Sequence, residues 1–156
     1  MGLTQNFTRE ELTTNGRHPS IPNDLPRGWE PRLLALAQKL EEARAILGVP
    51  LKVSYGYRSP ALNQACGGSD TSDHMFCYAA DFNPVGMGRE EAFRLLWAHP
   101  SFMRGADQMI IERGCIHLGI GPRNRKQGRG DMPFYPLLAV WPAALPLDLK
   151  AGGRRA

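Results

Sequence analysis

Cysteine is scarce in this sequence, with three residues among 156. Cys66, Cys77 and Cys115 do not form Cys-x-x-Cys pairs. Their number and spacing therefore indicate neither a disulfide framework nor a zinc ribbon. Such usage is typical of a protein that is made in a reducing compartment.

Long apolar runs are absent as well. No stretch contains the roughly 18 consecutive apolar residues of a membrane-spanning helix. The opening segment, MGLTQNFTREELTT, has neither the basic nor the apolar region of a secretory signal peptide. We therefore expect a chain that is synthesised in the cytoplasm, has no signal peptide and does not span a membrane.

The charge balance is only modestly basic, with a formal net charge of +4. Part of the excess lies in one late segment, at Arg123, Arg125, Lys126 and Arg129. This segment suits an anionic partner such as a cell-wall polymer, and it suits a solvated basic loop equally well. Because no aromatic platform or groove-reading helix accompanies it, we do not expect nucleic acid to be a partner.

Length and composition predict a single domain over residues 1–156. With 42% hydrophobic residues, the chain can form one substantial core but is too short for two comfortable ones. Thr8 and Glu11 have the spacing of a helix capping box. From about residue 121 the chain is basic and rich in proline, and we expect an irregular tail there.

Helices and short strands are predicted to alternate between these ends. Apolar periodicity predicts helices over 31–47, 58–66 and 88–99, with Ser59 capping the second, and strands over 51–57, 78–82, 107–112 and 115–120. Arg113 and Gly114 separate the last two strands and have the length of a two-residue hairpin turn.

Three side chains form a candidate zinc site. A catalytic zinc ion takes three protein ligands and keeps one position for water. His74 lies in a loop that leads into the strand of Asp81, and His117 comes from the later hairpin, so all three can face one pocket. Each also has an ordinary alternative: a histidine in an apolar strand is often a structural residue, and Asp81 can be a turn residue at a strand end.

Glu112 is the candidate general base. If Arg113 and Gly114 form the turn, Glu112 lies opposite Cys115 and shares a sheet face with it and with His117. A carboxylate in this diagonal position can take the proton of a water molecule as that water attacks a carbonyl carbon.

The segment YRSPALNQACGGSDTSDHMFCYAADF, residues 57–82, resembles the zinc peptidase family M15, subfamily A, which contains D-Ala-D-Ala carboxypeptidases and phage endolysins. The family carries a Ser-x-His-x-x-Gly-x-Ala-x-Asp signature after a Tyr-Arg-Ser-Pro element. Four residues fill that signature here: Ser72, His74, Ala79 and Asp81. The later DQMIIERGCIHLGI is similar to the family's segment with an acidic residue and the second zinc histidine. The likeness covers most of the chain, from about residue 7 to 127.

The resemblance implies an α+β fold with a small antiparallel sheet, flanking helices and an open zinc cleft, of the hedgehog and D,D-peptidase type. It implies one zinc ion per chain, bound by His74, Asp81 and His117. Arg58 would contact the substrate, at the carbonyl oxygen that gains charge or at a peptide carboxylate. Ser72 would bind the substrate backbone, and a turn hydroxyl is an equally good interpretation of this residue from the sequence.

Three positions depart from the family pattern. Cys77 replaces the signature glycine, Cys115 stands where an aromatic residue is often found, and Gly114 occupies the position of the acid in many relatives. Glu112 lies five positions before His117, which fits the family spacing only approximately. We expect Cys77 and Cys115 not to bind the metal, because a fourth protein ligand would displace the water.

Together, these expectations predict a zinc metallopeptidase that hydrolyses the stem peptides of bacterial peptidoglycan. It would act as a D-Ala-D-Ala carboxypeptidase or as an endolysin-type endopeptidase. The alternative is a catalytically inactive, zinc-containing binding or structural module of the same fold, and Glu112 distinguishes the two. We expect a monomer whose partner is the peptidoglycan peptide. We expect it to act on the cell wall, in phage or prophage host lysis or as a virion-associated enzyme.

Overall fold

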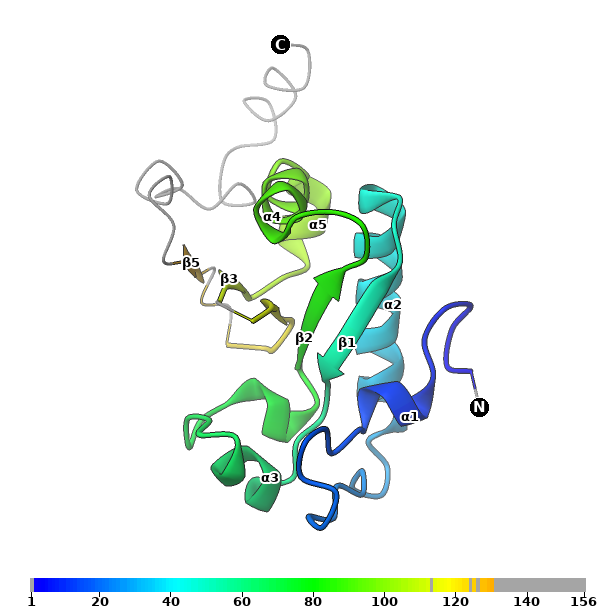
Figure 1. The fold of residues 1–156 in the computed structure, drawn as a ribbon, viewed down its shortest axis with the longest axis vertical. Coiled ribbons are helices and arrows are strands. Elements are labelled where there is room, and N and C mark those ends of the chain that lie inside the picture. The colour runs from blue at the N-terminus through cyan, green and yellow to red at the C-terminus, as the bar shows by residue number, and fades with distance from the viewer. Residues whose placement is uncertain (1, 113, 124, 126, 131–156) are drawn as a thin grey trace.

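Figure 1 shows the computed structural model of the protein, which describes residues 2–112, 114–123, 125 and 127–130. Its elements follow one another in this order: α1 (Arg9–Leu12), α2 (Glu30–Leu47), β1 (Leu51–Tyr55), α3 (Pro60–Ala65), the 3-10 helix η1 (Asp73–Phe76), β2 (Ala79–Pro84), α4 (Arg89–Trp97), α5 (Pro100–Arg104), β3 (Gln108–Ile111), β4 (Ile116–Gly119) and β5 (Gln127–Gly130).

The sequence signals that predicted helix starts and ends make the expected contacts in the structure. Pro31 stands in the first turn of α2, and Gly48 ends the helix with a φ of 69°, in the left-handed region that glycine adopts readily. Thr8 caps α1, because its hydroxyl accepts from the Glu11 N–H while the Glu11 carboxylate accepts from the Thr8 N–H at 2.8 Å. The predicted cap of α3 at Ser59 is confirmed too.

The strands form one sheet in the order β1-β2-β4-β3-β5. β1, β2, β4 and β3 pair antiparallel with their neighbours, so the predicted α+β fold with a small antiparallel sheet is confirmed for these four strands. β5 is different, because it pairs with β3 in parallel.

β5 corrects the prediction of an irregular tail from about residue 121. Residues 127–130 form a strand, although their sequence, QGRG, contains two glycines and no strand pattern. Hydrogen bonding to β3 at the sheet edge stabilises this strand, and a local sequence pattern cannot reveal such a distant partner. Residues 131–156 of the predicted tail lie outside the described residues.

Successive side chains of a strand point to opposite faces of the sheet, so the central strands have two different faces. Phe82 of β2 pairs with Ile116 of β4, and both belong to the hydrophobic core. Asp81 and His117, one position along, also pair with each other, and their side chains therefore lie on the opposite face. The sheet thus turns two polar side chains away from the core.

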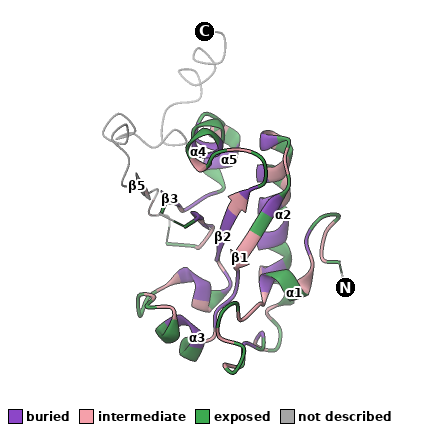
Figure 2. Cartoon of the chain, viewed as in Figure 1, coloured by how far each residue is buried: buried purple, intermediate pink, exposed green. Residues whose placement is uncertain are grey.

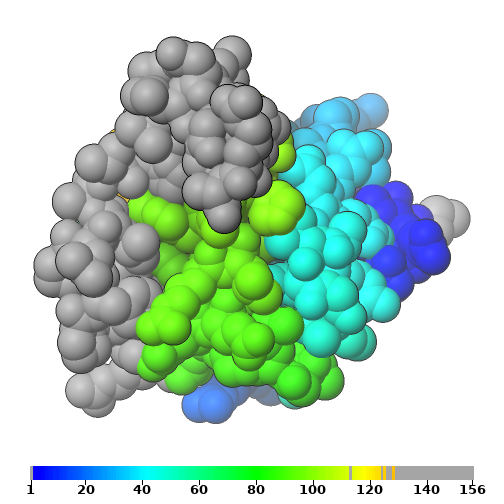
Figure 3. Space-filling view, turned by 90° about the horizontal axis from the view of Figure 1, so that it is seen from above, coloured from blue at the N-terminus to red at the C-terminus, as the bar shows by residue number. Residues whose placement is uncertain are grey.

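The helix α2 supplies much of the core, with Leu33, Leu36 and Leu40 completely buried. It lies behind β1 and β2 in Figure 1, and Figure 2 shows that β2 is buried along most of its length. Figure 3 looks at one end of the molecule, where the green surface around α4 and α5 adjoins the cyan surface around the end of α2 and β1. Among the described residues, no helix has the length and apolar character needed to cross a membrane.

Candidate metal centre

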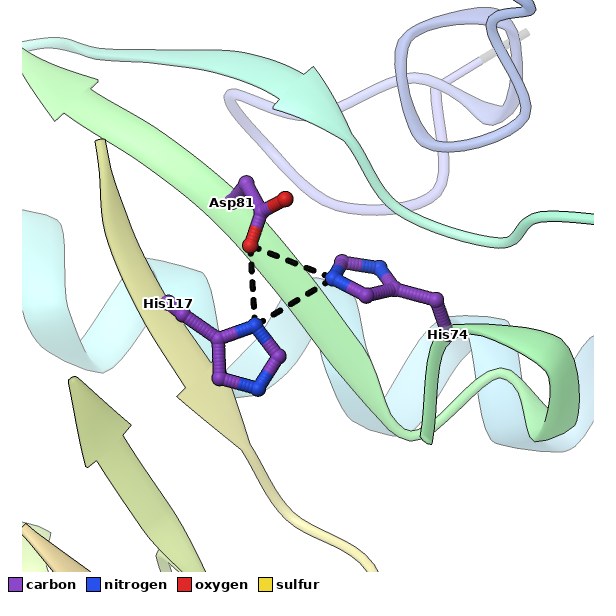
Figure 4. A group of neighbouring side chains, drawn as sticks. All are labelled: His74, Asp81 and His117. Carbon is purple, nitrogen blue, oxygen red and sulfur yellow. Dashed lines mark hydrogen bonds and ion pairs between the residues drawn. The ribbon is translucent and has the colours of Figure 1, made fainter. Parts of the chain in front are cut away.

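Three elements bring His74, Asp81 and His117 together. Asp81 of β2 and His117 of β4 are direct cross-strand partners, and His74 reaches them from η1. The prediction that His74 lies in a loop was wrong, because residues 73–76 form a 3-10 helix. The three side chains turn toward one point in Figure 4. They are 3%, 7% and 12% exposed, in the order His74, Asp81, His117.

The ligand atoms lie at the spacing of a metal site. His74 Nε2 is 3.1 Å from Asp81 Oδ1 and 3.2 Å from His117 Nδ1, and 2.9 Å separates His117 Nδ1 from Asp81 Oδ1. In a tetrahedral site with zinc–ligand distances of about 2.0 to 2.1 Å, neighbouring ligand atoms are about 3.3 Å apart. The cluster therefore needs only a small expansion to hold such an ion. Two imidazole nitrogens and one carboxylate oxygen are a donor set that suits zinc.

The His74 ring is oriented by the backbone of Gly56. His74 Nδ1 lies 2.7 Å from the Gly56 carbonyl oxygen. A carbonyl only accepts, so Nδ1 donates its hydrogen to it, and Nε2 is the ring nitrogen that faces the cluster. This hydrogen bond fixes the direction in which the ring presents Nε2.

Residue 56 must be glycine because another chain segment passes very close to it. A Cβ on Gly56 would stand 3.0 Å from both Cα and the carbonyl carbon of Leu12, and closer still to its oxygen. The neighbouring Tyr57 N–H donates to that oxygen at 2.8 Å. The end of α1 is thus packed against the backbone that orients His74.

Arg58 holds the other side of Asp81. Its Nη2 donates to Asp81 Oδ2 at 2.7 Å, and its guanidinium lies over the Tyr55 ring at 4.5 Å. Burial alone would raise the pKa of Asp81, but the charge of His74 and hydrogen bonds from His117 and His74 outweigh it and hold the pKa below its usual range. Asp81 therefore stays an anion. Arg58 Nε is buried without a hydrogen-bond partner among the described residues.

The cluster borders a cavity of about 510 Å³, called here the metal cavity. All the residues predicted to bind metal, to bind substrate or to act in catalysis line it: Arg58, Ser72, His74, Asp81, Glu112 and His117. The structure therefore gathers the predicted site residues in one place.

Glu112 and Cys115 are opposed across the hairpin, as the strand pattern predicts. The Glu112 N–H donates to the Cys115 carbonyl oxygen at 2.9 Å, and the Cys115 thiol donates to Glu112 Oε2 at 3.8 Å. Burial, together with the nearby charges of Asp81 and Glu112, raises the pKa of Cys115 to about 12. Cys115 is thus a neutral thiol that hydrogen-bonds the exposed Glu112 carboxylate.

Comparison with protein families shows to which family the chain belongs. The family described as Peptidase M15 matches residues 5–118, well over half of the chain and every predicted site residue. The chain belongs to peptidase family M15. Its substrate is therefore a peptide. The comparison with curated proteins gave no match.

The M15 signature keeps its backbone shape in spite of Cys77. This residue has φ 61° and ψ 36°, in the left-handed region that favours glycine, which is the residue in the family signature. Cys77 is completely buried, and burial raises the pKa of its thiol to about 12. The cysteine therefore occupies a glycine conformation as a neutral core residue.

Ser72 caps the helix that carries the first M15 histidine. Its hydroxyl accepts from the His74 N–H at 3.3 Å, and the residue also lines the metal cavity. This contact is the turn hydroxyl that the sequence left open as an alternative. Contact of Ser72 with the substrate backbone stays a prediction.

One network of arginine–aspartate ion pairs in this M15 peptidase could not be predicted from the sequence patterns. Buried Asp73 accepts from Arg123 Nη2 at 2.7 Å and also from Arg125, whose Nε donates to buried Asp107 at 2.7 Å. These two arginines are therefore not freely solvated, and they fasten the segment after β4 to the helix of His74. No local signal could have found them, because the carboxylates are far from the arginines in sequence.

Proposed function

We propose that this M15 peptidase is a zinc enzyme that hydrolyses the stem peptides of bacterial peptidoglycan, either as a D-Ala-D-Ala carboxypeptidase or as an endolysin-type endopeptidase. The observation that carries this proposal is the convergence of His74 Nε2, Asp81 Oδ1 and His117 Nδ1 beside the metal cavity. A cavity of about 510 Å³ suits a short peptide. A fold of the hedgehog and D,D-peptidase type is part of the same proposal.

The residues of the cluster fit the ion in chemistry as well as spacing. His74 and His117 would bind zinc as neutral imidazoles and Asp81 as a carboxylate. When bound, zinc lowers the pKa of water to about 7 and polarises a carbonyl group. The Gly56 carbonyl and the Arg58 guanidinium hold two of the three ligands in place.

Glu112 takes the role of proton carrier in this proposal. Its carboxylate lines the metal cavity, where it would accept the proton of the attacking water and pass it to the leaving amine. The thiol of Cys115 would steady that carboxylate through its hydrogen bond.

Arg58 and Ser72 serve the substrate. Arg58 lines the metal cavity, where its guanidinium would donate to the carbonyl oxygen that gains charge or to a peptide carboxylate. Ser72 lines the same cavity and would hold the substrate backbone.

The proposed place of action is the bacterial cell wall, where the substrate is. We propose that the protein acts on this substrate as a monomer. Host lysis by a phage or prophage, or entry with a virion, is the biological setting that we propose.

Mass spectrometry of purified peptidoglycan tests the function. The wall is incubated with the zinc-loaded protein, with and without a chelator. We expect loss of terminal D-Ala or new internal peptide ends, abolished by chelator and restored by zinc. If the zinc-loaded protein releases nothing from walls of several peptide types, the inactive zinc-containing module becomes the better interpretation.

A further inference from the structure

A second cavity adjoins the metal cavity. It measures about 300 Å³, and its apolar wall comes from Phe76, Tyr78 and Pro122. Thr71, Asp73 and Arg123 line both cavities, so the two are separated by shared side chains and not by the core. We call it the aromatic cavity.

The wall of the aromatic cavity is exposed and well supported. Phe76 is 46% exposed, yet its ring stacks on Trp29 with centroids 6.5 Å apart and planes 29° apart. Trp29 itself packs against the hydrophobic core. Arg32 lies over the Trp29 and Tyr78 rings at 4.4 and 4.9 Å and donates to the Phe76 carbonyl oxygen at 3.3 Å. The aromatic surface is therefore fixed in place before any ligand arrives.

Polar groups surround this aromatic wall. Arg123 donates to the Thr71 carbonyl oxygen at 2.8 Å and to Asp73 Oδ1 at 2.7 Å, while 40% of its side chain remains exposed. Asp70, which is exposed, lines the same cavity. The cavity thus combines an apolar aromatic face with charged donors and acceptors at its edge.

This combination suits a sugar ring. A pyranose offers a flat C–H face that packs on aromatic side chains, and its hydroxyl and amide groups point outward to the polar edge. A volume of about 300 Å³ is at the lower end of the roughly 300–1,000 Å³ of ligand sites, which favours one ring over a longer oligosaccharide.

We propose that the aromatic cavity binds an N-acetylated hexosamine ring of the glycan strand that carries the stem peptide. The inference rests on the proposed function, because in peptidoglycan the stem peptide is attached to a sugar. Because the two cavities share Thr71, Asp73 and Arg123, a stem peptide that is cut near its sugar-bearing end would place that sugar at the aromatic cavity. Phe76 and Tyr78 are then specificity-determining residues that distinguish wall-bound peptide from free peptide.

Paired substrates test this proposal. The zinc-loaded enzyme is assayed on a disaccharide-linked stem peptide and on the same peptide without sugars. We expect Phe76→Ala to lower kcat/KM for the sugar-linked substrate about tenfold, the size of one lost aromatic contact of about 1.4 kcal/mol. The free peptide should be cleaved as before. Phe76→Leu, which keeps apolar bulk without an aromatic face, should behave like Phe76→Ala.

Leu95→Ala is the matched control, because Leu95 is another exposed apolar side chain, on α4. It should change neither rate. Equal losses on both substrates in Phe76→Ala would overturn the proposal in favour of a subsite for a peptide side chain. Unchanged rates on both substrates would overturn it as well.

A binding measurement separates this inference from the proposed function. Trp29 stacks on Phe76, so its fluorescence should respond to titration with an N-acetylglucosamine tetramer in wild type and not in Phe76→Ala. A response without any peptidase activity would support the sugar site and contradict the proposed function. Peptidase activity without any response would contradict the sugar site alone.

Discussion

Arg58 and Asp81 form a buried ion pair, and the same carboxylate also contacts two histidines. Arg58 Nη2 is 2.7 Å from Asp81 Oδ2, while Oδ1 of the same carboxylate lies 2.9 Å from His117 Nδ1 and 3.1 Å from His74 Nε2. The arginine therefore sets the direction in which Asp81 presents its ligand oxygen. Outer partners of this kind orient the ligands and thereby raise metal affinity.

Arg58→Ala should weaken zinc binding about 10- to 100-fold, because Asp81 loses the group that orients it. Competition with a chelator of known affinity measures the change. Lys52→Ala, at an exposed position of β1, is the control and should have no effect. Unchanged zinc affinity together with lost activity would mean that Arg58 acts only on substrate.

The wild-type protein should contain about one zinc ion per chain after dialysis, since three ligands and one open position form one catalytic site. His74→Ala and His117→Ala should each lose most of it. Elemental analysis gives the answer directly. His18→Ala removes a histidine from outside the cluster and should keep the metal. A full zinc complement in either ligand variant would contradict the assignment.

Glu112→Gln should lower turnover by roughly two to four orders of magnitude, the usual scale of general acid–base catalysis. The amide keeps the size of the side chain and cannot accept the proton, and zinc content should not change. Glu91→Gln is the matched control, because Glu91 is an exposed carboxylate on α4 and lines neither cavity. Near-normal peptidoglycan cleavage by Glu112→Gln would show that another group acts as the base.

Gly56→Ala should destabilise the protein by about 1–3 kcal/mol, because the new methyl group collides with the backbone of Leu12. Urea unfolding measures this loss. Zinc affinity should fall too, since the Gly56 carbonyl orients His74. Gly88→Ser is the control: a Cβ there meets open space, and serine is favoured at this helix cap. Equal stability of the two variants would refute the close packing at residue 56.

Thiol titration should find one fast cysteine per chain at pH 8. Cys66 is partly exposed, whereas Cys77 and Cys115 are buried and have pKa values of about 12. At pH 8 only about one in ten thousand of such thiols is ionised, and the thiolate is the reactive form. Cys66→Ser should remove the fast phase. Cys77→Ser and Cys115→Ser should leave both that phase and the zinc content intact.

Local signals predicted the elements that local chemistry determines. The capping box at Thr8, the ends of α2 and the hairpin that faces Glu112 with Cys115 all follow from residues close in sequence. The period of two in the later hairpin also predicted that Cys115 and His117 share one sheet face. Those parts of the fold and of the site could therefore be predicted from the sequence alone.

Tertiary contacts determine the parts that the sequence patterns missed. β5 is a strand because β3 is beside it, and η1 was read as a loop because four residues of 3-10 helix leave little periodicity. The pairing of Arg125 with Asp73 and Asp107 joins residues that are far apart in the chain. The aromatic wall around Phe76 likewise needs Trp29, from the turn before α2.

The position of β2 and β4 inside the sheet has a consequence for the proposed metal site. Asp81 and His117 are separated by a backbone ladder that an apolar core supports from the other face, so their spacing does not depend on the metal. Small zinc domains fold only around their ion, and a chelator unfolds them. In this protein the paired strands position Asp81 and His117 before any metal binds. In the proposed zinc enzyme the ion would then be exchangeable, and metal supply would switch activity on and off in a chain that stays folded.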